Sequence, residues 1–102
     1  MPDADVTAPH VASTTPADNT TDVALSMPVT VIFDETVQGV DDTTLTAGVT
    51  ATVTATSATE YVLTPAADWP AATQITVQLT ADIHDAAGNA LAPTSFSFTT
   101  TP

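Results

Sequence analysis

The stretch Gln74-Ile-Thr-Val-Gln-Leu-Thr80 alternates polar and apolar residues at every position. Successive side chains of an extended chain point to opposite faces of a sheet, so apolar residues at every second position line a single face. Ile75, Val77 and Leu79 are therefore expected to face a core while the Gln and Thr side chains face solvent. A strand that is buried on one face only is typical of an antiparallel sheet.

The same alternation recurs on both sides of this stretch. It predicts strands at residues 10–13, 29–33, 51–55, 61–63, 75–79 and 96–98, with a weaker one at 36–40. Turn-forming residues separate them at 16–19, 41–42, 65–70 and 85–89, and no stripe of helical period is longer than one turn. Many short strands at this spacing indicate a sandwich or a barrel. We expect one all-β domain over residues 9–102, preceded by an interdomain linker at residues 1–8.

The charge of the chain has a single sign. There is no Lys and no Arg against 12 acidic residues, so the formal net charge is -12. Each carboxylate must therefore be hydrated, bonded to a backbone N–H or neutralised by a cation from solution, because only two His and the amino terminus could pair with it. Repulsion among like charges opposes the compact state. Nucleic acid and anionic membranes are expected to be poor partners, since both need a basic surface, and we expect neither nucleic-acid binding nor direct membrane insertion.

The composition is nevertheless that of a folded protein. Hydrophobic residues make up 43 % of the chain and the mean hydropathy is +0.21, values too apolar for a disordered acidic tail. The absence of Cys excludes a disulfide framework. The polar start, Met1-Pro-Asp-Ala-Asp5, predicts neither a signal peptide nor a membrane span, so we expect a piece of a longer exported protein.

Segments 15–23 and 28–35 resemble the opening of bacterial Ig-like domains of the SbsA type. Later motifs of that family follow in the same order: Thr-Leu, Thr-Pro, a strand ending in Leu-Thr, an Asp-x-Ala-Gly-Asn loop followed by Leu, and Phe-x-Phe-Thr-Thr (Thr44, Leu45, Thr64, Pro65, Leu79, Thr80, Asp85, Ala87, Gly88, Asn89, Leu91 and residues 96–100). The resemblance covers nearly the whole chain and implies an Ig-like β-sandwich of about seven antiparallel strands in two sheets. The chain departs from the family at Ile75, where Tyr is frequent, so the tyrosine-corner hydrogen bond is not expected there.

The resemblance also implies a function. Such domains look like spacers of S-layer proteins and secreted enzymes, and like the tandem extender repeats of calcium-loaded adhesins of the RTX type. It implies a non-catalytic structural repeat on the bacterial cell surface, joined to neighbouring copies through calcium and monomeric in isolation. If Pro102 is the first residue of a following copy, the repeat unit is residues 2–101.

The acidic residues predict where calcium would bind. Ca²⁺ takes about six to eight oxygen ligands, which loop carboxylates and carbonyls supply. If the strands run alternately up and down, the linker, the loop after the second strand and the loop before the last strand share one end of the domain. The acids of that end are the first predicted ligands, and two more acids could lie beside them (Asp3, Asp5, Asp34, Glu35, Asp82 and Asp85; Asp41 and Asp42). The acids of the opposite end are weaker candidates (Asp18, Asp22 and Asp68). In a tandem array the second end of one domain would meet the first end of the next, so that acids of both could share calcium.

Two observations keep an alternative open. Asp is common in turns because it bonds its own backbone, so each of these acids could be a solvated turn residue. Neither an EF-hand nor an RTX nonapeptide pattern occurs, so no contiguous motif defines the ligand set.

Three further features suggest other functions. His84 beside Asp85 could be a general base or a metal ligand, but no nucleophile converges on it, so we expect an exposed loop residue. His10 is too distant from His84 in sequence for a zinc-binding pair to be argued. Thr50, Thr52, Thr54 and Thr56 could form an ice- or sugar-binding array, but we expect the outward face of a strand. Trp69 could stack on a sugar, but we expect it to close the end of the core. The alternatives to an extender are therefore a carbohydrate-binding module and an accessory module of a secreted, salt-adapted enzyme.

Overall fold

The computed structural model describes residues 8–102, so most of the predicted linker, with the predicted ligands Asp3 and Asp5, lies outside the described residues. Within them the chain is all-β, as predicted, and has ten strands. Each of the seven strands expected from the sequence overlaps one of the ten. The strands are β1 (Val11–Thr15), β2 (Thr20–Val23), β3 (Val29–Phe33), β4 (Val37–Gln38), β5 (Leu45–Thr46), β6 (Ala51–Ala55), β7 (Glu60–Pro65), β8 (Gln74–Leu79), β9 (His84–Asp85) and β10 (Thr94–Thr100).

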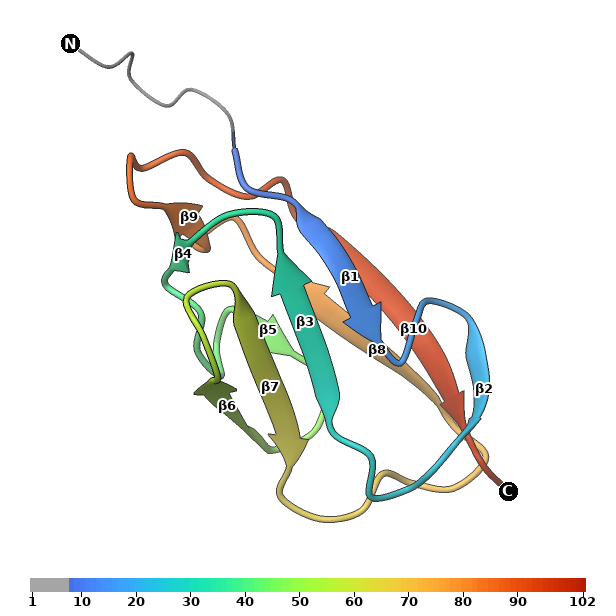
Figure 1. Cartoon of the computed structure of the whole chain (residues 1–102). Helices are drawn as coiled ribbons and strands as arrows, with labels where there is room; N and C mark the ends of the chain where they lie inside the picture. Colours follow the sequence, from blue (N-terminus) through green and yellow to red (C-terminus); the bar gives the residue numbers. More distant parts are fainter. Residues whose placement is uncertain (1–7) are drawn as a thin grey trace, which may run out of the picture.

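The strands form two four-stranded sheets, ordered β1-β3-β7-β6 and β2-β10-β8-β5, and a two-stranded ribbon, β4-β9 (Figure 1). This order corrects the up-and-down topology expected from the sequence. The consecutive strands β1 and β2 belong to opposite sheets, and β2 pairs with β10 in parallel. The chain changes sheet in the turn at residues 16–19, where Asn19 has a φ of 66°, a left-handed conformation in which Asn is enriched.

The core lies between the two sheets. Strand β8 alternates between exposed and buried residues along its whole length, as its sequence predicted. Val31 from one sheet and Val77 and Phe98 from the other are at most 1 % exposed. Full burial of an aliphatic or aromatic side chain stabilises a protein by about 1.5–3 kcal/mol, so the alternating residues of the strands supply most of the driving force for folding.

Trp69, in the β7–β8 connection, closes one end of the core against the β2–β3 connection. It is 1 % exposed, which confirms the prediction that it is part of the core. Its indole Nε1–H donates to the Met27 carbonyl at 2.7 Å, and its amide donates to the Leu25 carbonyl at 2.7 Å. The indole packs edge-to-face on Phe98, with 5.6 Å between ring centroids.

Tyr61 on β7 holds the β4-β9 ribbon to the sandwich. Its hydroxyl donates to the Val37 carbonyl at 3.1 Å, and its ring packs edge-to-face on Phe33. Ile75, the position at which the sequence departs from the family pattern that it resembles, is 4 % exposed and belongs to the apolar core. The tyrosine side chain that makes a partly buried hydrogen bond in the described residues is thus on β7.

The domain is elongated, with principal extents of 55 × 22 × 19 Å. The described chain begins at the end where β1 starts and leaves at the opposite end, at Pro102 (Figure 1). We call these the N-terminal end and the C-terminal end. The N-terminal end also contains the ends of β3 and β8 and the start of β10, because Val11 pairs with Phe33 and Thr94 pairs with Leu79.

Candidate functional site

The N-terminal end carries most of the described candidate acids. Asp34 and Glu35 directly follow β3, and Asp82 follows β8. Asp41 and Asp42 lie close to the Asp82 segment, because Gly39 approaches the Asp82 carbonyl so closely that a Cβ at Gly39 would be 2.6 Å from it. The side chain of Glu35 is half-buried and those of the four Asp are exposed.

The C-terminal end carries Asp22 and Asp68. Asp22 lies in β2 beside Val23, whose carbonyl accepts a hydrogen bond from the Thr101 amide at 3.0 Å. Asp68 precedes Trp69, whose amide is bonded to the β2–β3 connection. Both side chains are exposed. The two acids are therefore attached to segments that meet where the chain leaves the domain.

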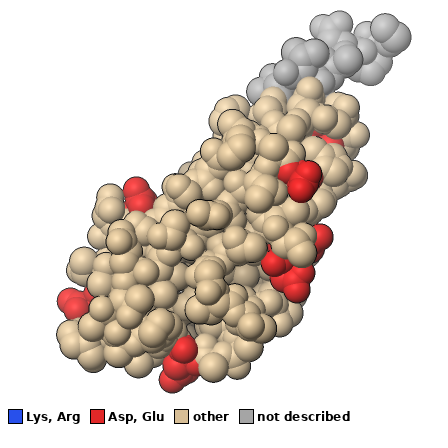
Figure 2. All heavy atoms as spheres, turned by 180° about the vertical axis from the view of Figure 1, so that it is seen from behind, with Lys and Arg blue, Asp and Glu red and all other residues tan. Residues whose placement is uncertain are grey.

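The acids do not form a complete metal site by themselves. Within residues 8–102, no three His, Asp or Glu side chains come together at a spacing that could hold one metal ion. Figure 2 shows the acidic side chains of one face as separate patches on an otherwise uncharged surface. The predicted calcium site thus needs oxygen ligands from elsewhere, such as backbone carbonyls, Asp3 and Asp5, or a neighbouring copy, and it stays a prediction.

Asp85, a first predicted ligand, has a structural role. It is 1 % exposed, and its Oδ1 accepts hydrogen bonds from the amides of Ala87 and Asn89 at 2.9 and 2.8 Å. Its Oδ2 accepts from the Asn89 side chain at 2.9 Å. The carboxylate therefore organises the loop at residues 85–89, in which Gly88 has a φ of +92°.

Asp41 is also engaged by its own turn. Its Oδ1 accepts from the Thr43 hydroxyl at 2.6 Å, from the Thr43 amide at 2.8 Å and from the Thr44 amide at 3.1 Å. The hydroxyl and amide of Thr43, joined by the Thr44 amide, hold the pKa of Asp41 below its ordinary value of 3.8. These donors stabilise the charged form, so the carboxylate stays ionised to lower pH than a solvated one.

Asp18 and Asp34 connect segments that are far apart in sequence. The Asp18 Oδ1 accepts from the Ser97 amide at 3.0 Å, which ties the β1–β2 turn to β10. The Asp34 Oδ1 accepts from the His10 amide at 2.9 Å, and its Oδ2 lies 3.5 Å from the His10 Nδ1. The Asp34 amide donates back to the His10 carbonyl at 2.9 Å. Backbone N–H groups thus serve as partners for several acids of a chain that has no Lys or Arg.

The remaining candidate features are structural. The His84 Nδ1 is 2.9 Å from the Asp82 carbonyl, so the imidazole helps to fix the turn before β9. Thr52 and Thr54 are exposed on β6, the outer strand of its sheet, as expected of an outward strand face. Trp69 is buried and cannot present its ring to a sugar, so the carbohydrate-binding alternative loses this residue and would depend on the loops.

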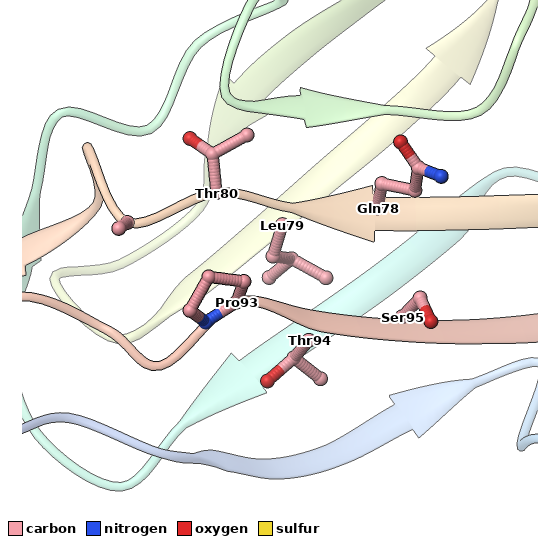
Figure 3. Close-up of a pocket in the computed structure, with 7 residues that line it drawn as sticks. Gln78, Leu79, Thr80, Pro93, Thr94 and Ser95 are labelled. Atoms are coloured by element: carbon pink, nitrogen blue, oxygen red, sulfur yellow. The ribbon is translucent and has the colours of Figure 1, made fainter.

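Two open grooves flank β8. The smaller, of about 360 Å³, lies between the end of β8 and the start of β10, and its lining includes Gln78 and Thr80 from one side and Pro93 and Thr94 from the other (Figure 3). The larger, of about 500 Å³, runs between β8 and the β5–β6 connection and includes Val49. No acidic or His side chain lines either groove. Within residues 8–102 there is no helix of the length and apolar character that a membrane-crossing helix requires.

Comparison with known proteins identifies the kind of domain. A family model described as a bacterial Ig-like domain matches residues 5–100. This match confirms the Ig-like resemblance seen in the sequence. The narrower resemblance to SbsA-type domains and to RTX-type adhesins stays a prediction. No curated protein matches the chain.

Three solved structures share the fold. An L,D-transpeptidase from Mycobacterium smegmatis is 26 % identical with a TM-score of 0.65, over 93 % of this chain and 41 % of that one. The LD transpeptidase LdtMt1 in complex with imipenem is 20 % identical with a TM-score of 0.66, over 91 % and 40 %. The surface layer protein SbsC, domains 1-6, is 18 % identical with a TM-score of 0.56, over 94 % and 14 %. The chain therefore spans less than half the length of each neighbour, and the last two likenesses show the fold alone.

Proposed function

The chain belongs to the bacterial Ig-like domain family, and on that basis we propose that it is a non-catalytic, calcium-stiffened extender repeat of a bacterial surface adhesin. In this role the domain holds a ligand-binding region away from the cell. Its shape supports the proposal, because the described chain starts at one end of a domain with extents of 55 × 22 × 19 Å and leaves at the other (Figure 1). Copies joined in series would form a rod.

The observation that carries the proposal is the exposed acids at both ends of an acid-only chain. Asp42 and Asp82 at the N-terminal end, and Asp22 and Asp68 at the C-terminal end, are exposed, and no hydrogen bond within the described residues engages their carboxylates. In a series of copies these two ends would face each other and repel. A shared calcium ion, which prefers carboxylate and carbonyl oxygens, would replace that repulsion with attraction.

The proposed ligand set is smaller than the set predicted from the sequence. Asp85, Asp41, Asp18 and Asp34 are left out, because their carboxylates already accept hydrogen bonds from backbone N–H groups. The proposed ligands are the linker acids, the half-buried Glu35 and the exposed acids of both ends whose carboxylates are not engaged in this way (Asp3 and Asp5; Glu35; Asp42, Asp82, Asp22 and Asp68).

Calcium titration of one copy and of two copies in series tests this proposal. Isothermal calorimetry should find more than twice as many calcium sites in the pair as in the single domain. Asp68→Asn in the first copy should remove the extra sites, whereas Glu60→Gln, which removes the same charge from β7, should leave them. A pair that binds only twice as many ions as the single domain would rule out a shared site.

A second candidate function is a spacer module of a secreted enzyme, with its acidity serving solubility in salt. The observation in its favour is the 26 % identity to part of an L,D-transpeptidase. Thermal unfolding separates the two candidates. A larger rise in Tm with calcium chloride than with sodium chloride of equal ionic strength supports the extender, and equal rises support the enzyme spacer.

A further inference from the structure

Strand β6 forms one edge of the sandwich. It pairs with β7 on one side, and no other strand in residues 8–102 pairs with it on the other. Its pairing with β7 is regular, one residue opposite one residue from Ala51 to Ala55. An edge of this kind presents unpaired N–H and C=O groups and is a ready template for another strand, so proteins usually protect it.

The other three outer strands are protected. Strand β1 has an irregular register between Val11 and Ser13 and is followed by Pro16, which has no N–H to donate. Strand β2 contains Asp22 in a left-handed conformation, with a φ of 56°, and its register with β10 also shifts. Strand β5 is only two residues long. Among the outer strands of the two described sheets, β6 is the long, regular and unprotected one.

The charge distribution singles out the same edge. Residues 43–59, which include all of β6, contain no charged side chain although the net charge of the chain is -12. Two copies that met at either end of the domain would bring carboxylates together. Two copies that met along β6 would oppose only Ala, Thr and Val, so a second copy suits this strand better than it suits the other edges.

The hydrogen-bond pattern fixes the register of such a pair. The Thr56 amide donates to the Glu60 carbonyl, and the Ala66 amide donates to the Thr50 carbonyl, each at 2.9 Å. Backbone groups of alternate residues point to opposite sides of an antiparallel strand. Thr52 and Thr54 therefore bond to β7, while the N–H and C=O groups of the intervening residues point outward (Ala51, Val53 and Ala55).

We propose that two copies of the domain associate by antiparallel pairing of their β6 strands, centred on Val53, once their mutual charge repulsion is screened. Val53 then lies opposite Val53 of the second copy, and Ala51 lies opposite Ala55, with about six hydrogen bonds in total. Between them Thr52 lies opposite Thr54, a pairing that stabilises antiparallel sheets. The β1-β3-β7-β6 sheets of the two copies then form one continuous sheet.

Sedimentation velocity of the single domain tests the association. Raising sodium chloride from about 0.01 M to about 1 M shortens the Debye length from about 30 Å to about 3 Å, and the domain should change from monomer to dimer. Sodium is used in the absence of calcium, so the result is independent of the proposed calcium sites. A domain that stays monomeric in about 1 M salt, at concentrations up to the millimolar range, would overturn the proposal.

Two substitutions at Val53 distinguish backbone pairing through β6 from nonspecific association. Val53→Pro removes an N–H that points away from β7, so it leaves the β6–β7 ladder intact, and it should weaken dimerisation at least tenfold. Val53→Thr keeps the N–H and a β-branched side chain, and should dimerise like the parent. Equal dimerisation of the Pro variant, with an unchanged circular dichroism spectrum, would contradict pairing through β6.

Cysteine cross-linking tests the register, and it applies even if Val53→Pro fails to fold. The chain has no Cys, so each introduced thiol is the sole one present. A mixture of Thr52→Cys and Thr54→Cys in about 1 M sodium chloride should form disulfide-linked heterodimers at least ten times faster than either variant forms homodimers. Equal rates for all three combinations would overturn the proposed register.

Discussion

At the scale of single residues, Gly39 and Gly48 share one backbone conformation, with a φ of +77° at each, but differ in their surroundings. A Cβ at Gly48 would meet nothing within 4 Å, whereas a Cβ at Gly39 would lie 2.6 Å from the Asp82 carbonyl and 3.3 Å from the His84 ring. The left-handed conformation costs a residue with a Cβ about 1–2 kcal/mol. Gly48→Ala should therefore lose about that much stability and serves as the control.

Gly39→Ala should lose a further 1–3 kcal/mol or so, because the added methyl group must push the Asp82 backbone away. Urea unfolding of both variants measures the difference between them. Equal losses in the two variants would show that the ribbon β4-β9 moves aside without cost. Such a result would make the contact between Gly39 and the Asp82 segment unimportant for holding the acids of the N-terminal end.

The Asp41 turn predicts a pH dependence. Because the Thr43 hydroxyl and amide lower the folded-state pKa of Asp41 below 3.8, the stability they contribute is present above pH 3.8 and is lost as the pH falls through the lowered value. Thr43→Ala should therefore be less stable than the parent at pH 7, and this difference should disappear at the acid end of the range. NMR titration should show the Asp41 pKa rising toward 3.8 in Thr43→Ala, and remaining low in Thr36→Ala, an exposed threonine outside the turn.

Sequence reasoning located the acids but could not separate their roles. Asp82 and Asp85 lie three positions apart in the same polar stretch, and both were predicted to bind calcium. The difference arises from the fold: Asp82 is exposed, whereas Asp85 is 1 % exposed because β9 pairs with β4. One signal was in the sequence, since Asn89 and Gly88 after Asp85 indicate a tight loop that an Asp side chain commonly closes.

At the scale of elements, alternation predicted the strands that bury one face and missed those that do not. Strand β8 follows its pattern residue by residue. Strands β2, β5 and β9 have four, two and two residues, too short to show any period. The parallel pairing of β2 with β10 joins the second strand to the last strand, and no local signal encodes a contact between segments so far apart in sequence. The up-and-down order was wrong for that reason.

The loop between β9 and β10 provides a prediction at this scale. Asp85→Ala removes the acceptor of two backbone amides, Ala87 and Asn89, and should destabilise the domain by about 2–3 kcal/mol. Asp82→Ala removes the same charge from an exposed position and should change the free energy of unfolding by less than about 0.5 kcal/mol. Chemical denaturation measures both, and similar small effects would show that the loop holds without its carboxylate.

At the scale of the whole molecule, the acid-only composition matters more than any single site. No Lys or Arg offsets the 12 acidic residues, and described acids such as Asp18, Asp34, Asp41 and Asp85 are instead paired with backbone N–H groups. These bonds satisfy each carboxylate locally, but they leave the net charge unchanged. Repulsion among the acids of each end and along the surface therefore remains in the folded state, where the charges are closer together than in the unfolded chain.

This repulsion predicts how stability responds to salt. The free energy of unfolding should rise as sodium chloride screens the charges. This rise should be smaller in a variant with fewer exposed acids. Asp22→Asn, Asp42→Asn and Asp68→Asn together change the net charge from -12 to -9, since 12 − 3 = 9, at positions whose carboxylates are exposed. The triple variant should gain about 1 kcal/mol at low salt and show a shallower dependence on salt. If its salt dependence matched that of the parent, the surface acids would be too far apart to repel. The acidity would then have to be explained by cation binding at particular sites, a result that calcium titration of the same triple variant would check directly.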